Sequence, residues 1–241
     1  SDTFTLLVGD VINLCGTIST DSVLSTDIVK VNCNVIVDDG VTLTIPAGTY
    51  VEFQANYYIQ VNGRLLAEGT NSENILFTVP SGNEATGWGG IQFAVDSATN
   101  EPSIIDYCQF EYAITGGNGG AIQILNSQNI SIENSYFSYN EAGTGGAIYF
   151  YDSDVEIMNN TFYKNTATAS GGAIASSDST LFAISGNTFE KNNANNGGAI
   201  YIENTHFMSP EITSNNFLRN KSYNSGAVMY LQKSDPLIQD N

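Results

Sequence analysis

Basic side chains are scarce in this sequence. The 241 residues include 7 Lys and Arg against 25 Asp and Glu, and the formal net charge is −18 at pH 7. Nucleic acids and anionic lipids carry charge of the same sign and would be repelled, so neither is expected as a partner. The polar residues are mainly Asn, Ser, Thr and Gly, which favours strands and turns over helices.

Long apolar runs are also missing. A membrane-spanning helix needs about 20 consecutive, mostly apolar residues, and no such stretch occurs. Ser1 is not followed by the basic and then apolar segments that direct secretion. We therefore expect no direct membrane span and no targeting signal within residues 1–241.

Cysteine and histidine are rare, with 3 Cys and 1 His in the chain. Zinc sites need close pairs of Cys with further Cys or His, so the spacing of Cys15, Cys33 and Cys108 predicts no metal site. In an oxidising compartment, Cys15 and Cys33 could join neighbouring N-terminal segments through a disulfide. We expect Cys108 to be buried and inert, the alternative being a thiol that pairs with another molecule.

A repeat of about 26 residues occupies the second half of the chain. Four Gly-Gly-Ala-Ile segments recur at this spacing, and a Ser-Gly-Ala-Val segment follows them at residues 225–228. A Phe-x-x-Asn motif recurs between them, with each Phe five residues after an Ile. Its members are Phe137 with Asn140, Phe162 with Asn165, Phe189 with Asn192, and Phe217 with Asn220. Several landmarks in constant register indicate a structural repeat.

The alternation within each repeat is that of β-strands. Apolar residues occupy every second position after each glycine pair, as at Ile122 and Ile124, and again later, as at Ile130 and Ile132. We expect three strands and three turns to close one triangular coil, and successive coils to stack in parallel with a right-handed crossover. The predicted fold class is all-β, a single-stranded right-handed parallel β-helix with about 26 residues per coil in the C-terminal half. Two internal columns are predicted: Ile122, Ile148, Ile174, Ile200 and Val228, and Phe137, Phe162, Phe189 and Phe217.

One β-helix domain is predicted over residues 1–241. Residues 1–118 would form irregular coils, because alternating segments such as 41–46 and 59–63 precede the repeats and residues 89–91 look like a degenerate Gly-Gly-Ala-Ile. Residues 119–241 would form regular coils and end within a coil. Clusters of Gly, Asn, Ser and Thr predict longer loops at 80–87 and 96–102.

Glycine and asparagine have structural roles in such a coil. A glycine pair at a corner permits positive φ and close approach of neighbouring backbones. The Asn of each Phe-x-x-Asn motif could stack into a ladder whose amides bond to one another and to the turn backbone. We predict this structural ladder at Asn140, Asn165, Asn192 and Asn220.

The Gly-Gly-Ala-Ile and Phe-x-x-Asn motifs of residues 119–228 resemble the repeat of the polymorphic outer-membrane protein family. This resemblance implies a β-helix that serves as a surface-exposed adhesin. Residues 42–49 and 61–70 look like a segment that is common in secreted right-handed β-helix proteins.

Polysaccharide lyases and hydrolases are the main alternative, because many right-handed β-helices cleave acidic glycans along one face. Such sites need clustered carboxylates with a nearby base, or calcium with a basic proton abstractor. Only Arg64 and Arg219 carry a guanidinium, and the sole histidine, His206, has no acidic motif beside it. We predict that the chain is not an enzyme and holds no cofactor or metal. Calcium between coils is a less favoured interpretation than solvated acidic turns for Asp152, Asp154, Asp178 and Asp235.

The polar surface offers candidate modification and contact residues. Asn129 and Asn159 begin Asn-x-Ser/Thr tripeptides and are candidate glycosylation sites in a eukaryotic secretory setting. Asn220 begins a third, but its place in the predicted ladder should make it inaccessible. Alternation predicts outward tyrosines that could contact a glycan or a protein, namely Tyr149, Tyr151, Tyr163 and Tyr201.

These features predict an extracellular structural or adhesive protein, secreted or at the cell surface, that forms a segment of a stalk or filament. Open coil ends would expose unpaired strand edges, which predicts end-to-end self-association. A glycan or a host or surface protein is the other expected partner. A dedicated binding module for glycan or ice is a third class, but the outward Thr-x-Thr rows that it needs are missing.

Overall fold

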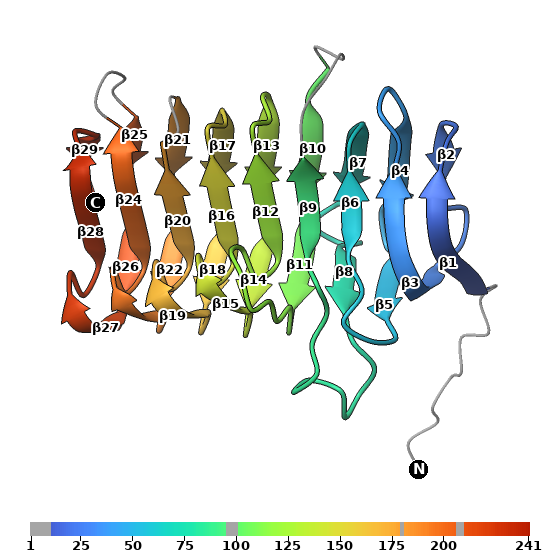
Figure 1. Ribbon diagram of the computed structural model, residues 1–241, viewed down its shortest axis with the longest axis horizontal. Helices are drawn as coiled ribbons and strands as arrows, with labels where there is room; N and C mark the ends of the chain where they lie inside the picture. The colour runs from blue at the N-terminus through green and yellow to red at the C-terminus, as the bar shows by residue number, and fades with distance from the viewer. Residues whose placement is uncertain (1–10, 95–100, 179–180, 206–209) are drawn as a thin grey trace.

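The computed structural model describes residues 11–94, 101–178, 181–205 and 210–241. In these residues every regular element is a β-strand, and the chain winds into a right-handed parallel β-helix of about 8 turns with ~26 residues per turn. Figure 1 shows successive coils lying side by side along the long axis, from β1 at one end to β28 and β29 at the other. The predicted fold class is confirmed.

A 16-stranded sheet wraps around two faces of the coils. The long strand β3 (Ile28–Val37) joins the faces, because its first half pairs with β5 and its second half with β6. Strand β1 (Val11–Ile18) pairs with β3 along both halves. The phenylalanine face contains β5 (Tyr50–Phe53), β8 (Ile75–Thr78), β11 (Cys108–Glu111), β14 (Tyr136–Ser138), β18 (Thr161–Tyr163), β22 (Thr188–Glu190) and β26 (Asn216–Leu218). The glycine face contains β6 (Ile59–Val61), β9 (Ile91–Ala94), β12 (Ile122–Leu125), β16 (Ile148–Tyr151), β20 (Ile174–Ser177), β24 (Ile200–Thr205) and β28 (Met229–Ser234).

Two further sheets complete the coils. The nine-stranded sheet contains β2 (Ser22–Val23), β4 (Thr42–Pro46), β7 (Arg64–Glu68), β10 (Ser103–Asp106), β13 (Ile130–Glu133), β17 (Val155–Met158), β21 (Phe182–Ser185), β25 (Glu211–Thr213) and β29 (Leu237–Gln239). The four-stranded sheet contains β15 (Glu141–Thr144), β19 (Thr166–Ser170), β23 (Asn193–Asn196) and β27 (Lys221–Ser225). Each regular coil thus has four strands, and the expectation of three was wrong. The extra strand buries only small residues, such as Ala142, Ala167 and Ala194, so it gives no alternation of large apolar side chains.

A continuous stack of phenylalanine rings fills the core beneath the phenylalanine face. Neighbouring ring centroids are 4.7 to 4.9 Å apart and their planes lie within 11° of parallel. The stack confirms the predicted column and extends it by two coils towards the N-terminus. Its members are Phe77, Phe110, Phe137, Phe162, Phe189 and Phe217. Offset rings at this separation attract one another and bury a large apolar area, so the column fixes the register of the coils.

The aliphatic column of the glycine face is confirmed at four of its five predicted positions. Ile122, Ile148, Ile174 and Ile200 are paired in register. The fifth position was wrong, because Ile200 pairs with Met229 and not with Val228. Gly226 has φ +65°, and the first glycine of each earlier pair has φ between +61° and +68°. The need for positive φ at this corner therefore sets the register, and the Ala-Val dipeptide does not.

The two glycines of each pair are needed for different reasons. The first, as in Gly145 with φ +65°, turns the corner in the left-handed region. The second lies against the next coil: a Cβ on Gly146 would be 2.2 Å from the carbonyl oxygen of Gly172 and 2.6 Å from that of Thr166. A Cβ cannot occupy this space, since both atoms belong to backbone.

Gly146→Ala should therefore destabilise the protein by about 3 kcal/mol or more, because the corner must open to admit the methyl group. Chemical denaturation measures the change. Gly116→Ala is the matched control, since a Cβ there meets nothing within 4 Å, and it should change stability by less than about 0.5 kcal/mol. Equal stability of the two variants would contradict the close packing of coils at this corner.

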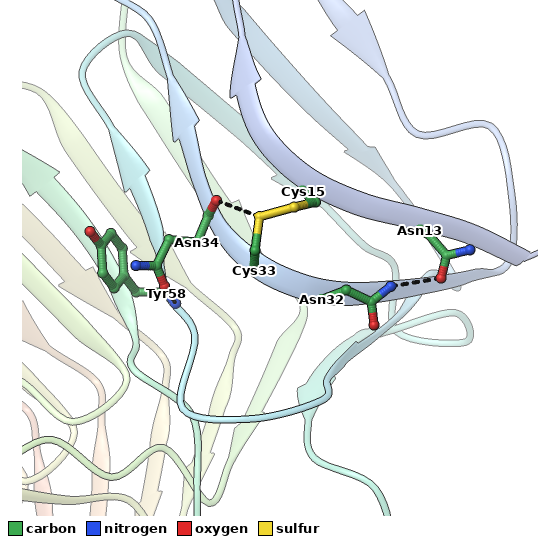
Figure 2. Close-up of a disulfide and its surroundings, with 6 residues drawn as sticks. All are labelled: Asn13, Cys15, Asn32, Cys33, Asn34 and Tyr58. Carbon is green, nitrogen blue, oxygen red and sulfur yellow. Dashed lines mark hydrogen bonds between the residues drawn. A yellow bond between two sulfur atoms is a disulfide. The ribbon is translucent and has the colours of Figure 1, made fainter.

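The N-terminal coils carry the predicted disulfide. Cys15 and Cys33 are bonded, with a Cα–Cα distance of 4.9 Å, at the point where β1 and β3 pass from one face to the other. Figure 2 shows Asn32 beside it, whose Nδ2 donates a hydrogen bond to Asn13 Oδ1 at 2.7 Å. The predicted loop at 80–87 is confirmed, whereas most of the loop predicted at 96–102 lies outside the described residues.

Candidate functional site

The predicted asparagine ladder is present. The Oδ1 atom of Asn165 accepts hydrogen bonds from the backbone N–H of Asn140 at 3.1 Å and from its Nδ2 at 2.9 Å. The Nδ2 of Asn165 donates to the carbonyl oxygen of Phe137 at 2.9 Å. Asn192 and Asn220 repeat this pattern in the next two coils. Each amide therefore satisfies backbone groups of the preceding coil where the chain turns away from its strand.

A second ladder runs parallel to the first and was not predicted. Asn160, Asn187 and Asn215 have the same contacts, since each Oδ1 accepts a backbone N–H of the preceding coil and each Nδ2 donates to a carbonyl there. Asn241 continues it. The sequence carried the signal, because each of the first three lies two residues before a stacked Phe, in an Asn-x-Phe-x-x-Asn motif.

The ladder amides are thus bonded to one another and to the turn backbone, so they are not free to hold a ligand. Cys108 begins the second ladder, with its backbone N–H donating to Ser135 Oγ at 3.0 Å. Its thiol is buried and unpaired with another cysteine, as predicted, and burial raises its pKa. A thiol in this state is a poor nucleophile.

Asn165→Ala should destabilise the protein by about 2 to 4 kcal/mol, because it leaves two donors of Asn140 and the carbonyl of Phe137 buried without a partner. The exposed Asn195, in the four-stranded sheet, is the matched control, and Asn195→Ala should have little effect. Equilibrium denaturation of both variants gives the comparison. A small loss at Asn165, equal to that at Asn195, would show that the ladder does not carry stability.

The candidate glycosylation residues lie at the surface. Asn129 and Asn159 are both exposed, each at a turn with φ +57°. Asn220 is bonded within the first ladder as expected, but it is half-buried and not fully covered. Its amide is nevertheless held by Asn192 and Phe189, so Asn129 and Asn159 are the more accessible candidates.

The four predicted tyrosines face outward. Tyr151 is exposed, and Tyr149, Tyr163 and Tyr201 are half-buried. Tyr201 stacks on Tyr230, with ring centroids 5.6 Å apart. Burial, together with the hydrogen bond from its hydroxyl to Glu203 Oε2 at 3.1 Å, raises the pKa of Tyr201 to about 12. Tyr201 therefore stays protonated at neutral pH, and its ring acts as a packing surface.

A groove of about 400 Å³ lies along the nine-stranded sheet. It is lined by an outward column in which Glu156, Ala183 and Glu211 stand in register on β17, β21 and β25. Leu181 and Asn129 also line it. The two exposed glutamates are two coils apart, which is roughly 10 Å along the column. The groove has the volume of a small-ligand site.

Four of the seven basic residues gather along one edge, between the phenylalanine face and the four-stranded sheet. We call this edge the cationic corner, and its basic residues are Lys164, Lys191, Arg219 and Lys221. The first three each precede a ladder Asn and have φ of 54°, 58° and 55°. They therefore occupy the same turn of three successive coils, about 4.8 Å apart. The sequence prediction missed this row, although the residue before each ladder Asn identifies it.

The predicted acidic turns do not form a metal site in the described residues, where no group of three or more His, Cys, Asp or Glu side chains could hold a metal ion. Asp152 and Asp178 share one column through the register of β16 and β20, while Asp154 stands in line with Leu181. His206 lies outside the described residues. Among the described residues, no helix is long and apolar enough to cross a membrane.

The model of the right handed beta helix region family matches residues 70–241, more than half of the chain. The chain belongs to this family. No curated protein and no solved structure matches it. For this β-helix, the match confirms the predicted right-handed solenoid and assigns no activity, because the same fold supports both enzymes and structural proteins.

Proposed function

We propose that this β-helix is an extracellular structural or adhesive shaft, a segment of a cell-surface stalk or filament. The observation that carries the proposal is the set of unbroken columns: one phenylalanine stack and two asparagine ladders tie every regular coil to the next. Columns of this kind make a stiff, extended body, since each coil is packed and hydrogen-bonded to both neighbours. Adhesive contacts, glycans on Asn129 or Asn159, and end-to-end association of copies belong to the same proposal.

The disulfide supports an extracellular location for the protein. Bonds such as Cys15–Cys33 persist in oxidising surroundings and are rare in reducing ones. A net charge of −18 keeps an exposed protein soluble and discourages its adsorption to anionic surfaces.

Protein isolated from its native source in the presence of an alkylating agent should show one thiol, Cys108, and only after unfolding. Reduction before alkylation should release two more. Mass spectrometry of the alkylated peptides gives the count. In parallel, a membrane-impermeant label should reach the protein on intact cells. Three free thiols, or a protein that the label reaches only after lysis, would contradict an extracellular shaft.

A polysaccharide-processing enzyme is the second candidate, and the groove of the nine-stranded sheet favours it. Inverting glycosidases place two carboxyl groups about 6.5 to 9.5 Å apart. Glu156 and Glu211 are two coils apart in the groove, so their backbone positions are roughly 10 Å apart, just above the range for the carboxyl groups. The shaft proposal expects these glutamates to be solvated surface residues.

Incubation with a panel of neutral and acidic polysaccharides should therefore release no reducing ends and no unsaturated products above background. If products do form, Glu156→Gln and Glu211→Gln decide their origin, with Glu133→Gln on the same sheet as the control outside the groove. If both groove variants abolish turnover and the control variant retains it, the protein is an enzyme and the proposal of a structural shaft is wrong.

A further inference from the structure

The cationic corner is unusual because it concentrates positive charge on an acidic protein. Among the described residues, the carboxylate paired with this group is Glu190, which lies 2.9 Å from Lys191 and 3.5 Å from Arg219. Four positive charges less one negative charge leave three at this edge, against −18 for the whole chain. Glu111 and Glu141 belong to coils that precede Lys164, so acidic residues lie beyond one end of the row. The corner is a local reversal of charge.

Tyrosines are interleaved with these cations. Lys164 Nζ lies 5.1 Å from the ring centroids of both Tyr139 and Tyr163. Lys191 Nζ lies 5.0 Å from Tyr163, and Lys221 Nζ lies 4.6 Å from Tyr223. Cation–π contacts hold the ammonium groups on the outer surface in fixed positions. Tyr139 is 41% exposed and Tyr223 is 68% exposed, so ring surface remains for a ligand.

Lys164 and Lys191 stay charged at neutral pH. A hydrogen bond to Tyr139 raises the pKa of Lys164, and a hydrogen bond to Glu190 raises the pKa of Lys191. The hydrogen bond from Lys191 lowers the pKa of Glu190, which keeps this carboxylate ionised and able to position Lys191 and Arg219. The row therefore persists as a preorganised set of charges.

We propose that the cationic corner binds a linear acidic polysaccharide that runs along the long axis of the shaft. The row repeats once per coil, about every 4.8 Å, which suits a polymer with one carboxylate per sugar. Exposed tyrosine rings offer flat apolar surfaces on which sugar rings can pack. Nucleic acid is a poorer fit, since duplex DNA carries one charge per about 1.7 Å, which is far denser than cations spaced about 4.8 Å apart.

This proposal rests on the proposed function, because it names the class of partner to which an adhesive shaft would attach. The probe is a fluorescently labelled alginate oligosaccharide, in which every sugar carries a carboxylate, and anisotropy measures its binding. The intact chain should bind this probe, and an unlabelled neutral mannan should compete for binding far more weakly than unlabelled alginate. The affinity for the probe should fall by about 10-fold or more between about 50 and about 200 mM salt.

A charge-matched pair of triple variants tests the location. Lys164→Asn, Lys191→Asn and Arg219→Asn together remove the row while keeping a residue that tolerates positive φ. Lys30→Asn, Arg64→Asn and Lys233→Asn remove the same charge elsewhere. The row variant should bind the alginate probe at least about 10-fold more weakly than the control variant. Equal loss in both variants would overturn the corner as the site, since net charge alone would then explain binding.

A poly-glutamate peptide of similar charge separates the partner classes. The proposal expects it to bind more weakly than alginate, because it lacks sugar rings for the tyrosines, and binding of equal strength would assign the corner to an acidic protein segment instead. The impermeant-label experiment on intact cells keeps the two proposals apart. If the protein is exposed at the surface but does not bind alginate, only the proposed partner is wrong. If it binds alginate but is confined to the cell interior, only the extracellular function is wrong.

Discussion

The hydrogen bond from one asparagine amide to the next is the interaction on which this β-helix depends. Each coil must turn sharply at several places, and a turn takes backbone groups out of the strand pairing. In the turn at Asn140 these groups face the interior, where an unpaired donor or acceptor costs about 1 to 3 kcal/mol. Asn165 of the next coil satisfies them. Coils are therefore completed by their neighbours, and no coil is complete alone.

The ladders also allow the surface residues beside them to differ from coil to coil. The residue before each ladder Asn is held at positive φ, a conformation that costs roughly 1 kcal/mol or more for side chains other than glycine. Yet this position holds Tyr139, Lys164, Lys191 and Arg219 in successive coils. Because the buried amides fix the turn, the exposed residue beside them can vary in type without loss of the fold. The second glycine of each pair is the opposite case, because its contact with the backbone of the next coil excludes any side chain.

The sequence revealed features that repeat with large or distinctive side chains. The phenylalanine column and the first ladder follow directly from Phe-x-x-Asn spacing, and the corner glycines follow from their period. The fourth strand did not, because Ala142 and its equivalents are too small to produce alternation. Met229 was missed because positive φ at Gly226 fixes the register more strongly than composition does. The groove and the cationic corner depend on which coils stand side by side, and their chemistry is not fixed by the fold.

The asparagine ladders have a consequence for how such a protein changes in length. A cut at the same point of two successive turns removes one full set of donors together with one full set of acceptors, and the remaining ends match. Gly145 and Gly171 are such equivalent points. Insertions and deletions of whole turns therefore preserve every buried bond, while a change of one or two residues breaks the alignment. The length of such a β-helix can thus change in steps of one turn while its buried bonds are kept.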